Sequence, residues 1–163
     1  MKYTILIITL LFILFLNNVN AQSHIETKYS TTIEAEEGSK LLNQPSRKTP
    51  KFISNYYTPE EEDIRQMELN FNKIKSLKSG NKQINNLEQY AYQYVGIIID
   101  GNKYIYINAF SISCFETFPI WIETWKKEPI TMYDGGDLYW GAVYNPVSNR
   151  FSQLFFNHKV KSF

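Results

Sequence analysis

The sequence has little of the chemistry that most small enzymes use. Its 163 residues contain one cysteine, Cys114, and two histidines, His24 and His158. A single cysteine cannot form an intramolecular disulfide, so stability must come from a buried core. One cysteine and two distant histidines also cannot supply the ligands of a structural zinc site. We therefore expect no disulfide, no bound metal and no cofactor.

An excess of charge of either sign is also missing. Lys and Arg number 17, Asp and Glu number 16, and the formal net charge is +1 at pH 7. Binding to nucleic acid or to an acidic membrane surface depends on a strong positive field, which this composition does not provide. The glycine-rich phosphate loop and the Gly-x-Ser-x-Gly nucleophile motif are absent from the sequence as well. We therefore expect no nucleic-acid partner.

Long hydrophobic runs are confined to the first residues. Lys2 precedes a run that is almost wholly apolar from Ile5 to Leu16, and Val19 and Ala21 fit the −3 and −1 positions of a cleavage site. The run is shorter than the roughly 20 residues that span a bilayer. Residues 1–21 are therefore interpreted as a signal peptide, with an uncleaved anchor as the alternative. We expect an exported protein, periplasmic or extracellular, without a membrane span after cleavage.

The apolar pattern divides the remaining chain at about residue 58. Residues 22–57 are rich in Ser, Thr, Lys, Glu, Asn and Gln, are interrupted by Pro45 and Pro50, and show no sustained apolar period. Such a segment offers too little apolar surface to offset the entropy lost on ordering. The sequence therefore predicts a flexible leader over 22–57, with a short ordered piece at 33–42 as an alternative, and a single folded domain over 58–163.

A helix is predicted at the start of this domain. Thr58, Pro59 and Glu61 suit the N-cap, the first helical position and the capping-box acid, in that order. Gly80 is a suitable stop. Apolar residues between these points recur at helical spacing and line one face: Ile64, Met67, Phe71, Ile74 and Leu77. We expect this face to pack on a sheet.

The rest of the domain has the composition and the turn signals of β-strands. The predicted strands are Tyr90–Ile99, Lys103–Phe110, Ile130–Tyr133, Leu138–Tyr144 and Phe151–Val160. A tight turn at Asp100-Gly101-Asn102 would place Val95 opposite Tyr106 and Tyr94 opposite Ile107. Both faces of that hairpin are apolar, which indicates a central pair of strands buried on both sides.

The last part of the chain completes the predicted fold. Residues 111–128 carry aromatic side chains at irregular helical spacing and are interpreted as an irregular crossover. In the final hairpin, Trp140 would lie opposite Phe155 and Tyr144 opposite Phe151. One N-terminal helix packed on an antiparallel sheet of about five strands is an α+β fold, and its nearest architecture is a cystatin-like roll.

A succession of short motifs runs through the C-terminal half. They are Gln93-Tyr94-Val95-Gly96, Asp100-Gly101, Tyr106-Ile107-Asn108, Asp134-Gly135-Gly136, Tyr139-Trp140-Gly141, Val143-Tyr144 and Phe155-Phe156-Asn157. In these motifs the chain resembles a group of small exported bacterial proteins for which no activity is known. The resemblance covers roughly the last 75 residues. It implies that this part forms one domain, and it implies no chemistry.

A small cysteine-dependent hydrolase is the catalytic alternative. It would need Cys114 as nucleophile, a histidine as base and a third group to orient the histidine. His24 falls in the predicted leader, which leaves His158 on the last strand. With Ile112 and Phe115 beside it in the sequence, Cys114 is more simply explained as a buried small hydrophobe.

Two carboxylates flank a pair of glycines near the end of the chain. Asp134 and Asp137 are separated by Gly135-Gly136 and offer oxygens to calcium. Calcium requires 6–8 oxygen ligands, and few acidic residues lie nearby. A tight turn between strands is the simpler interpretation of this segment, because Asp and Gly are common turn formers.

Aromatic residues are abundant, with 12 Tyr, 11 Phe and 3 Trp. Most of them should form the core, because a small domain without disulfides needs large buried side chains. Some could instead form an exposed patch for an unknown protein, peptide or glycan. The candidates for such a binding patch are Trp121, Trp125, Trp140, Tyr104 and Tyr106. The favoured function is thus a non-catalytic binding or interaction module, and the alternative is the hydrolase built on Cys114 and His158.

Overall fold

The structure is a computed structural model that describes residues 29–158. The predicted signal peptide at residues 1–21 and the last residues of the strand predicted to reach Val160 lie outside this range. No helix in the described part of the chain is long and apolar enough to cross a membrane.

Short strands and helices precede and follow one central hairpin. In chain order they are β1 (Ser30–Thr32), η1 (Ala35–Glu37), α2 (Gly38–Leu42), β2 (Ile53–Tyr57), α3 (Glu61–Leu69), η2 (Phe71–Ser76), β3 (Lys78–Ser79), β4 (Lys82–Gln83), β5 (Tyr90–Ile99), β6 (Asn102–Ser111), α4 (Cys114–Thr117), α5 (Trp121–Thr124), η3 (Gly136–Leu138), β7 (Tyr139–Asn145) and β8 (Arg150–Phe156). The elements labelled η are 3-10 helices.

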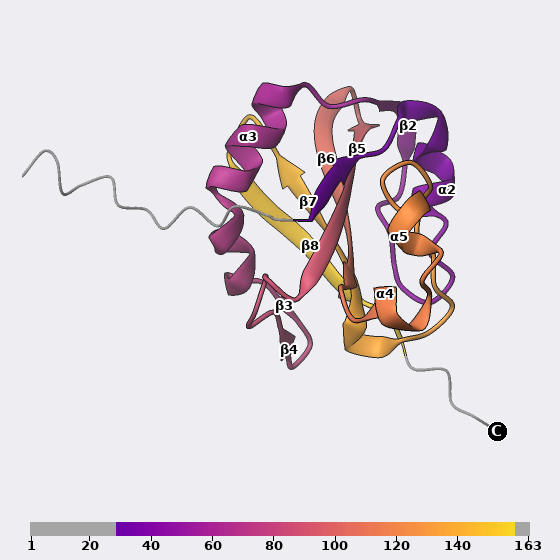
Figure 1. The fold of residues 1–163 in the computed structure, drawn as a ribbon. Helices are drawn as coiled ribbons and strands as arrows, with labels where there is room; N and C mark the ends of the chain where they lie inside the picture. Colours follow the sequence, from indigo (N-terminus) through magenta and orange to yellow (C-terminus); the bar gives the residue numbers. More distant parts are fainter. Residues whose placement is uncertain (1–28, 159–163) are drawn as a thin grey trace, which may run out of the picture.

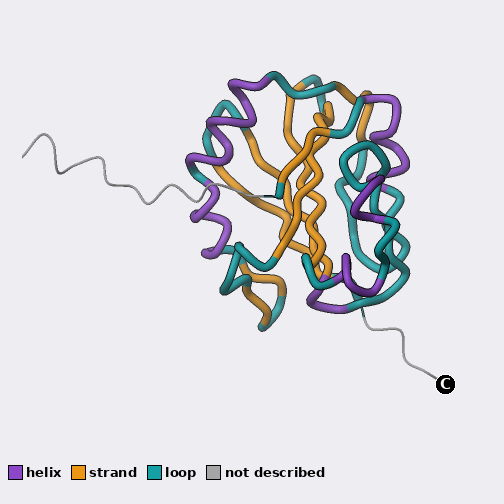
Figure 2. Tube along the Cα trace, in the orientation of Figure 1, coloured by secondary structure: helices purple, strands orange, loops and turns teal. Residues whose placement is uncertain are grey.

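A six-stranded sheet forms the middle layer of the molecule (Figure 2). Its strand order is β1-β5-β6-β7-β8, and β2 also pairs with β5. All pairs are antiparallel except β1 with β5. Helix α3 lies on one side of this sheet, and α2, α4 and α5 lie on the other (Figure 1). The predicted α+β class with a mainly antiparallel sheet is thereby confirmed.

The central hairpin has the predicted register. Val95 lies opposite Tyr106 and Tyr94 opposite Ile107. Both faces are buried, as their apolar character predicts. We call the face under α3 the helix face and the other the crossover face. The core on the helix face includes Met67, Phe71, Ile74, Tyr92, Tyr94, Ile107, Trp140 and Tyr144. The core on the crossover face includes Ile33, Leu41, Val95, Ile97, Tyr106, Phe110 and Trp125.

Helix α3 begins later than predicted and is interrupted. Its N-cap is Glu60, and no side chain caps its first turn. The Thr58 hydroxyl is engaged elsewhere, because it accepts a hydrogen bond from the Ala35 backbone N–H and donates one to the Glu34 carboxylate. The α-helix ends at Leu69, and after its C-cap Asn70 the chain continues as η2. The whole predicted apolar stripe still packs on the helix face.

Residues 30–57 form part of the fold, whereas the sequence predicted a flexible leader there. Two strands from this segment pair with the outer edge of β5, and Ile33, Leu41 and Leu42 are buried on the crossover face. Backbone pairing with an available strand edge requires no apolar period, which explains why the pattern missed it. Helix α3 therefore follows two strands and is not the first element, and the cystatin-like roll remains a prediction.

The predicted strand Ile130–Tyr133 is absent. Side chains occupy the carbonyls that a neighbouring strand would use: Gln44 and Asn108 donate to the Ile130 carbonyl, and Ser46 and Asn157 donate to the Met132 carbonyl. The segment is therefore extended along the crossover face without belonging to the sheet.

The final hairpin contains a bulge that shifts its register. Tyr144 pairs with Phe151 as predicted, but Trp140 pairs with Phe156 and not with Phe155. The register changes between Gly141 and Val143. Gln153 adopts a φ of 55°, which fits the extra residue of a bulge.

Candidate functional site

The five aromatic residues proposed for binding do not form one patch. Trp140 is buried on the helix face, whereas Tyr106 and Trp125 are buried on the crossover face. Trp121 and Tyr104 are partly exposed and pack against two different core clusters. Three of the five thus contribute to the core, and only Trp121 and Tyr104 reach the surface.

Cys114 has the surroundings of a structural thiol. It is 3% exposed, and its sulfur lies 3.0 Å from the Tyr139 hydroxyl. Burial raises the pKa of the Cys114 thiol, and the hydrogen bond with Tyr139 only partly opposes this. The side chain of His158 is exposed, and its backbone N–H donates to the Ser46 carbonyl. Within residues 29–158, no hydrogen bond joins Cys114 to His158.

The segment from Asp134 to Asp137 is not the predicted tight turn between two strands, because no strand precedes it and Gly136 and Asp137 begin the 3-10 helix η3. Gly135 and Gly136 adopt φ values of 95° and 54°, which L side chains rarely reach. The Asp137 carboxylate forms an ion pair with Lys82. The described residues contain no group of three or more His, Cys, Asp or Glu side chains that could hold a metal ion.

A buried arginine that the sequence analysis missed lies on the crossover face. Arg47 is 6% exposed. Its guanidinium donates to the Tyr106 hydroxyl from Nε (3.2 Å) and Nη2 (3.0 Å), to Asn157 Oδ1 from Nη1 (3.0 Å), and to Asn108 Oδ1 from Nη2. No carboxylate forms an ion pair with Arg47 in the part of the chain that the structure describes. All of its partners are therefore neutral.

Buried amides extend this network across the sheet. Gln93 Nε2 donates to the carbonyls of Trp125 (2.6 Å) and Glu128 (2.7 Å), while its Oε1 accepts from Asn108 Nδ2 (3.0 Å). Gly141 leaves room for the Tyr106–Arg47 pair, because a β-carbon there would come 2.6 Å from the Tyr106 hydroxyl and 3.1 Å from Arg47 Nε. We call this set the polar layer: Gln44, Arg47, Gln93, Asn108 and Asn157. It fixes the crossover to the sheet.

The polar layer holds the crossover, residues 111–128, against the sheet. The outer side of this crossover carries apolar side chains. Ile120 and Ile122 are 62% and 61% exposed. The Trp121 ring stacks on Phe118, with ring centroids 4.7 Å apart and planes inclined by 26°. Its inner edge meets Phe110 of the core at a centroid distance of 5.7 Å. Trp121 is thus held rigidly at the surface.

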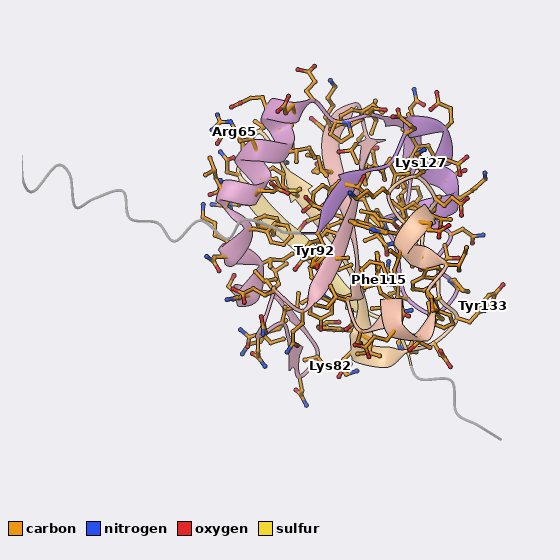
Figure 3. The ribbon with its side chains drawn as sticks, in the orientation of Figure 1. Arg65, Lys82, Tyr92, Phe115, Lys127 and Tyr133 are labelled. Carbon is orange, nitrogen blue, oxygen red and sulfur yellow. The ribbon has the colours of Figure 1, made fainter. Side chains whose placement is uncertain are left out.

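Two adjoining hollows continue from Trp121. The first, of about 250 Å³, is lined by Ile120 and Trp121, and the second, of about 310 Å³, is lined by Tyr133; both also contact Pro129 and Thr131. Tyr133 is 76% exposed and lies at the outer edge of the molecule (Figure 3). We call these five residues the crossover surface.

Comparisons with protein-family models, with curated proteins and with solved structures found no match. Function is therefore inferred from the geometry of the chain itself.

Proposed function

We propose that the chain is an exported, non-catalytic binding module that contacts a protein partner through the crossover surface. One observation carries the proposal. Nine large hydrophobic residues are exposed within residues 29–158. Three of them lie close together in the sequence of the crossover, Phe118, Ile120 and Ile122, and a fourth, Tyr133, lines the adjoining hollow. Clustered exposed apolar side chains mark interaction sites, whereas scattered ones do not.

The geometry favours a protein segment as the ligand. Trp121 lines one of the two adjoining hollows and Tyr133 lines the other. Trp and Tyr are among the residues that most often dominate interface energies. Trp121 is already fixed by Phe118 and Phe110, so little side-chain entropy is lost when a partner binds.

A photo-crosslinking amino acid placed at position 122 or 147 tests this proposal in the source cells. Ile122 lies beside Trp121, and Val147 is exposed in the turn before β8. Position 122 should give a covalent adduct with a partner protein. That adduct should be lost when Trp121→Ala and Tyr133→Ala are combined, because each Trp or Tyr anchor contributes about 2 kcal/mol or more.

Position 147 provides the matched control. Adducts of equal yield from both positions, or an adduct at 122 that survives the double substitution with the fold intact, would contradict the crossover surface as the site. Thermal unfolding of each variant establishes that the fold is intact.

Hydrolysis through Cys114 and His158 is the less favoured function. Because burial raises the pKa of the Cys114 thiol, a smaller fraction is thiolate near pH 8 than in free cysteine. We expect a thiol reagent to react slowly with the native protein and rapidly after denaturation. Fast reaction of the native protein would instead support the hydrolase.

A further inference from the structure

A separate hollow of about 500 Å³ lies between the segment before β2, the end of β5 and strand β8. We call it the lysine groove and define it by Lys48, Lys51, Phe52, Ile99, Gln153 and Phe155. It shares no lining residue with the crossover surface. Its volume falls within the roughly 300–1,000 Å³ that is usual for small-molecule sites.

Both charged side chains that line the lysine groove are positive. Lys48 and Lys51 are exposed, and neither forms an ion pair among the described residues. No Asp or Glu lines the groove. A carboxylate or another anion would therefore meet two positive charges and no opposing negative one.

The rest of the groove is largely apolar. Ile99 and Phe155 are half-buried and present hydrocarbon to the hollow. Phe52 is 85% exposed, so its ring covers almost no part of the core. A ligand with an apolar body would remove all three side chains from water, which is the main source of binding energy for such sites.

Backbone strain is concentrated at the same place. Four residues other than glycine have positive φ within residues 29–158. Two of them, Asp100 and Asn149, belong to turns and to residue types that tolerate this conformation. The other two, Phe52 at 61° and Gln153 at 55°, both line the lysine groove. Strained residues cluster at ligand sites.

The ring of Phe52 contributes little to the packing of the fold. Glycine would adopt a φ of 61° without steric cost, and the exposed ring contributes little burial to offset the strain. Packing within the described residues therefore does not account for a Phe at this position.

We propose that the lysine groove binds an anionic amphiphile, namely a carboxylate with an unbranched apolar chain. The carboxylate lies between Lys48 and Lys51. The chain lies against Ile99 and Phe155, and the Phe52 ring packs over it. This site is independent of the partner contact at the crossover surface.

Titration of the purified protein with decanoate, decan-1-ol and decyltrimethylammonium, all below their micelle concentrations, tests the proposal. Calorimetry gives the affinities, and amide chemical shifts locate the site. We expect decanoate to bind most tightly, with the largest shift changes at Lys51, Phe52 and Gln153. Affinity should increase by about fourfold for each methylene added from hexanoate to decanoate until the groove is filled.

Substitutions separate the two parts of the site. Combining Lys48→Gln with Lys51→Gln should weaken decanoate by about fivefold or more and leave decan-1-ol unchanged. The matched control combines Lys78→Gln with Lys127→Gln, two exposed lysines outside the groove, and should affect neither ligand. Phe52→Gly should weaken both ligands while the melting temperature stays the same or rises, since glycine relieves the strain.

Four outcomes would overturn the proposal, and the first three concern small ligands. They are equal affinity for the three head groups, no decanoate binding at millimolar concentration, and shift changes confined to residues outside the groove. Binding to vesicles of anionic phospholipid without binding to free decanoate would also overturn it, because the ligand would then be a membrane surface. The crossover variants Trp121→Ala and Tyr133→Ala should not alter decanoate binding.

Discussion

At the scale of single residues, Arg47 combines burial with a positive charge that no acidic side chain within residues 29–158 neutralises. A buried charge is costly unless hydrogen bonds replace its hydration. The guanidinium obtains four, to Tyr106, Asn108 and Asn157. Because those acceptors come from β6 and from the end of β8, one side chain connects strands that are not adjacent in the sheet.

Replacing Arg47 by Met should lower the free energy of unfolding by about 1–3 kcal/mol. Met keeps most of the volume but removes the guanidinium donor from Asn157 Oδ1 and leaves Asn108 Oδ1 with only the long hydrogen bond from Gln44 Nε2 (3.5 Å). Arg65→Met is the matched control. Arg65 is exposed, and its ion pair with Glu62 joins residues of the same helix, so the change should stay within about 0.5 kcal/mol.

Urea unfolding of the two variants provides the comparison. If Arg47→Met were as stable as the original protein or more so, the free energy needed to remove the guanidinium from water would equal or exceed the stabilisation from its hydrogen bonds. The polar layer would then contribute specificity rather than stability.

At the scale of secondary-structure elements, β2 is held by two tyrosines that each lie over a glycine. A β-carbon on Gly96 would overlap the ring of Tyr57, and one on Gly38 would overlap the ring of Tyr56. The Tyr57 hydroxyl also donates to the Tyr104 carbonyl at 3.2 Å. These contacts fix a strand whose own sequence has little apolar alternation.

Gly96→Ala should therefore destabilise the protein by about 1–3 kcal/mol, as overpacking of a core does. The cost should largely disappear when Gly96→Ala is made in a Tyr57→Ala background, because the obstructing ring is gone. A double-mutant cycle by thermal unfolding measures this coupling. Additive effects of the two substitutions would mean that the ring moves aside and that its packing on Gly96 contributes nothing.

The elements differ in how far the sequence could predict them. The register of β5 and β6 follows from the turn at Asp100-Gly101 and from local alternation. The bulge at Gln153 carries no local signal, since only its conformation in the finished sheet reveals it. Strands β1 and β2 depend on the free edge of β5, so their own residues could not predict them.

At the scale of the whole molecule, residues 30–57 contribute two strands of the sheet (β1 and β2), several core residues and part of the polar layer. They contribute Ile33 and Leu41 to the core of the crossover face, and Gln44 and Arg47 to the polar layer.

A fragment of residues 58–163 lacks these contributions and should therefore fail to unfold cooperatively. A fragment that begins at Tyr29 is the control and should unfold like the full chain. A cooperative transition in the shorter fragment, followed by circular dichroism, would show that the first two strands are dispensable.

The candidate sites were less predictable than the fold because they join distant segments. Arg47 meets partners at positions 106, 108 and 157, and the lysine groove combines residues 48–52 with Ile99 and with β8. No spacing rule along the chain connects these positions. Of the five aromatic candidates, Trp121 alone belongs to the crossover surface, and its exposure depends on how the crossover packs.

Ser30 pairs with Tyr92, a residue far from it in the sequence, and this separation affects the order in which the strands form. Contacts between residues far apart in the chain form late, because a long loop must close first. Until β1 and β2 dock, β5 has a partner on one side only, and its sequence from Tyr90 to Ile99 contains no charge and no proline. Such an edge pairs readily with the same edge of another chain. Docking of residues 30–57 therefore ends the interval in which newly synthesised chains can aggregate.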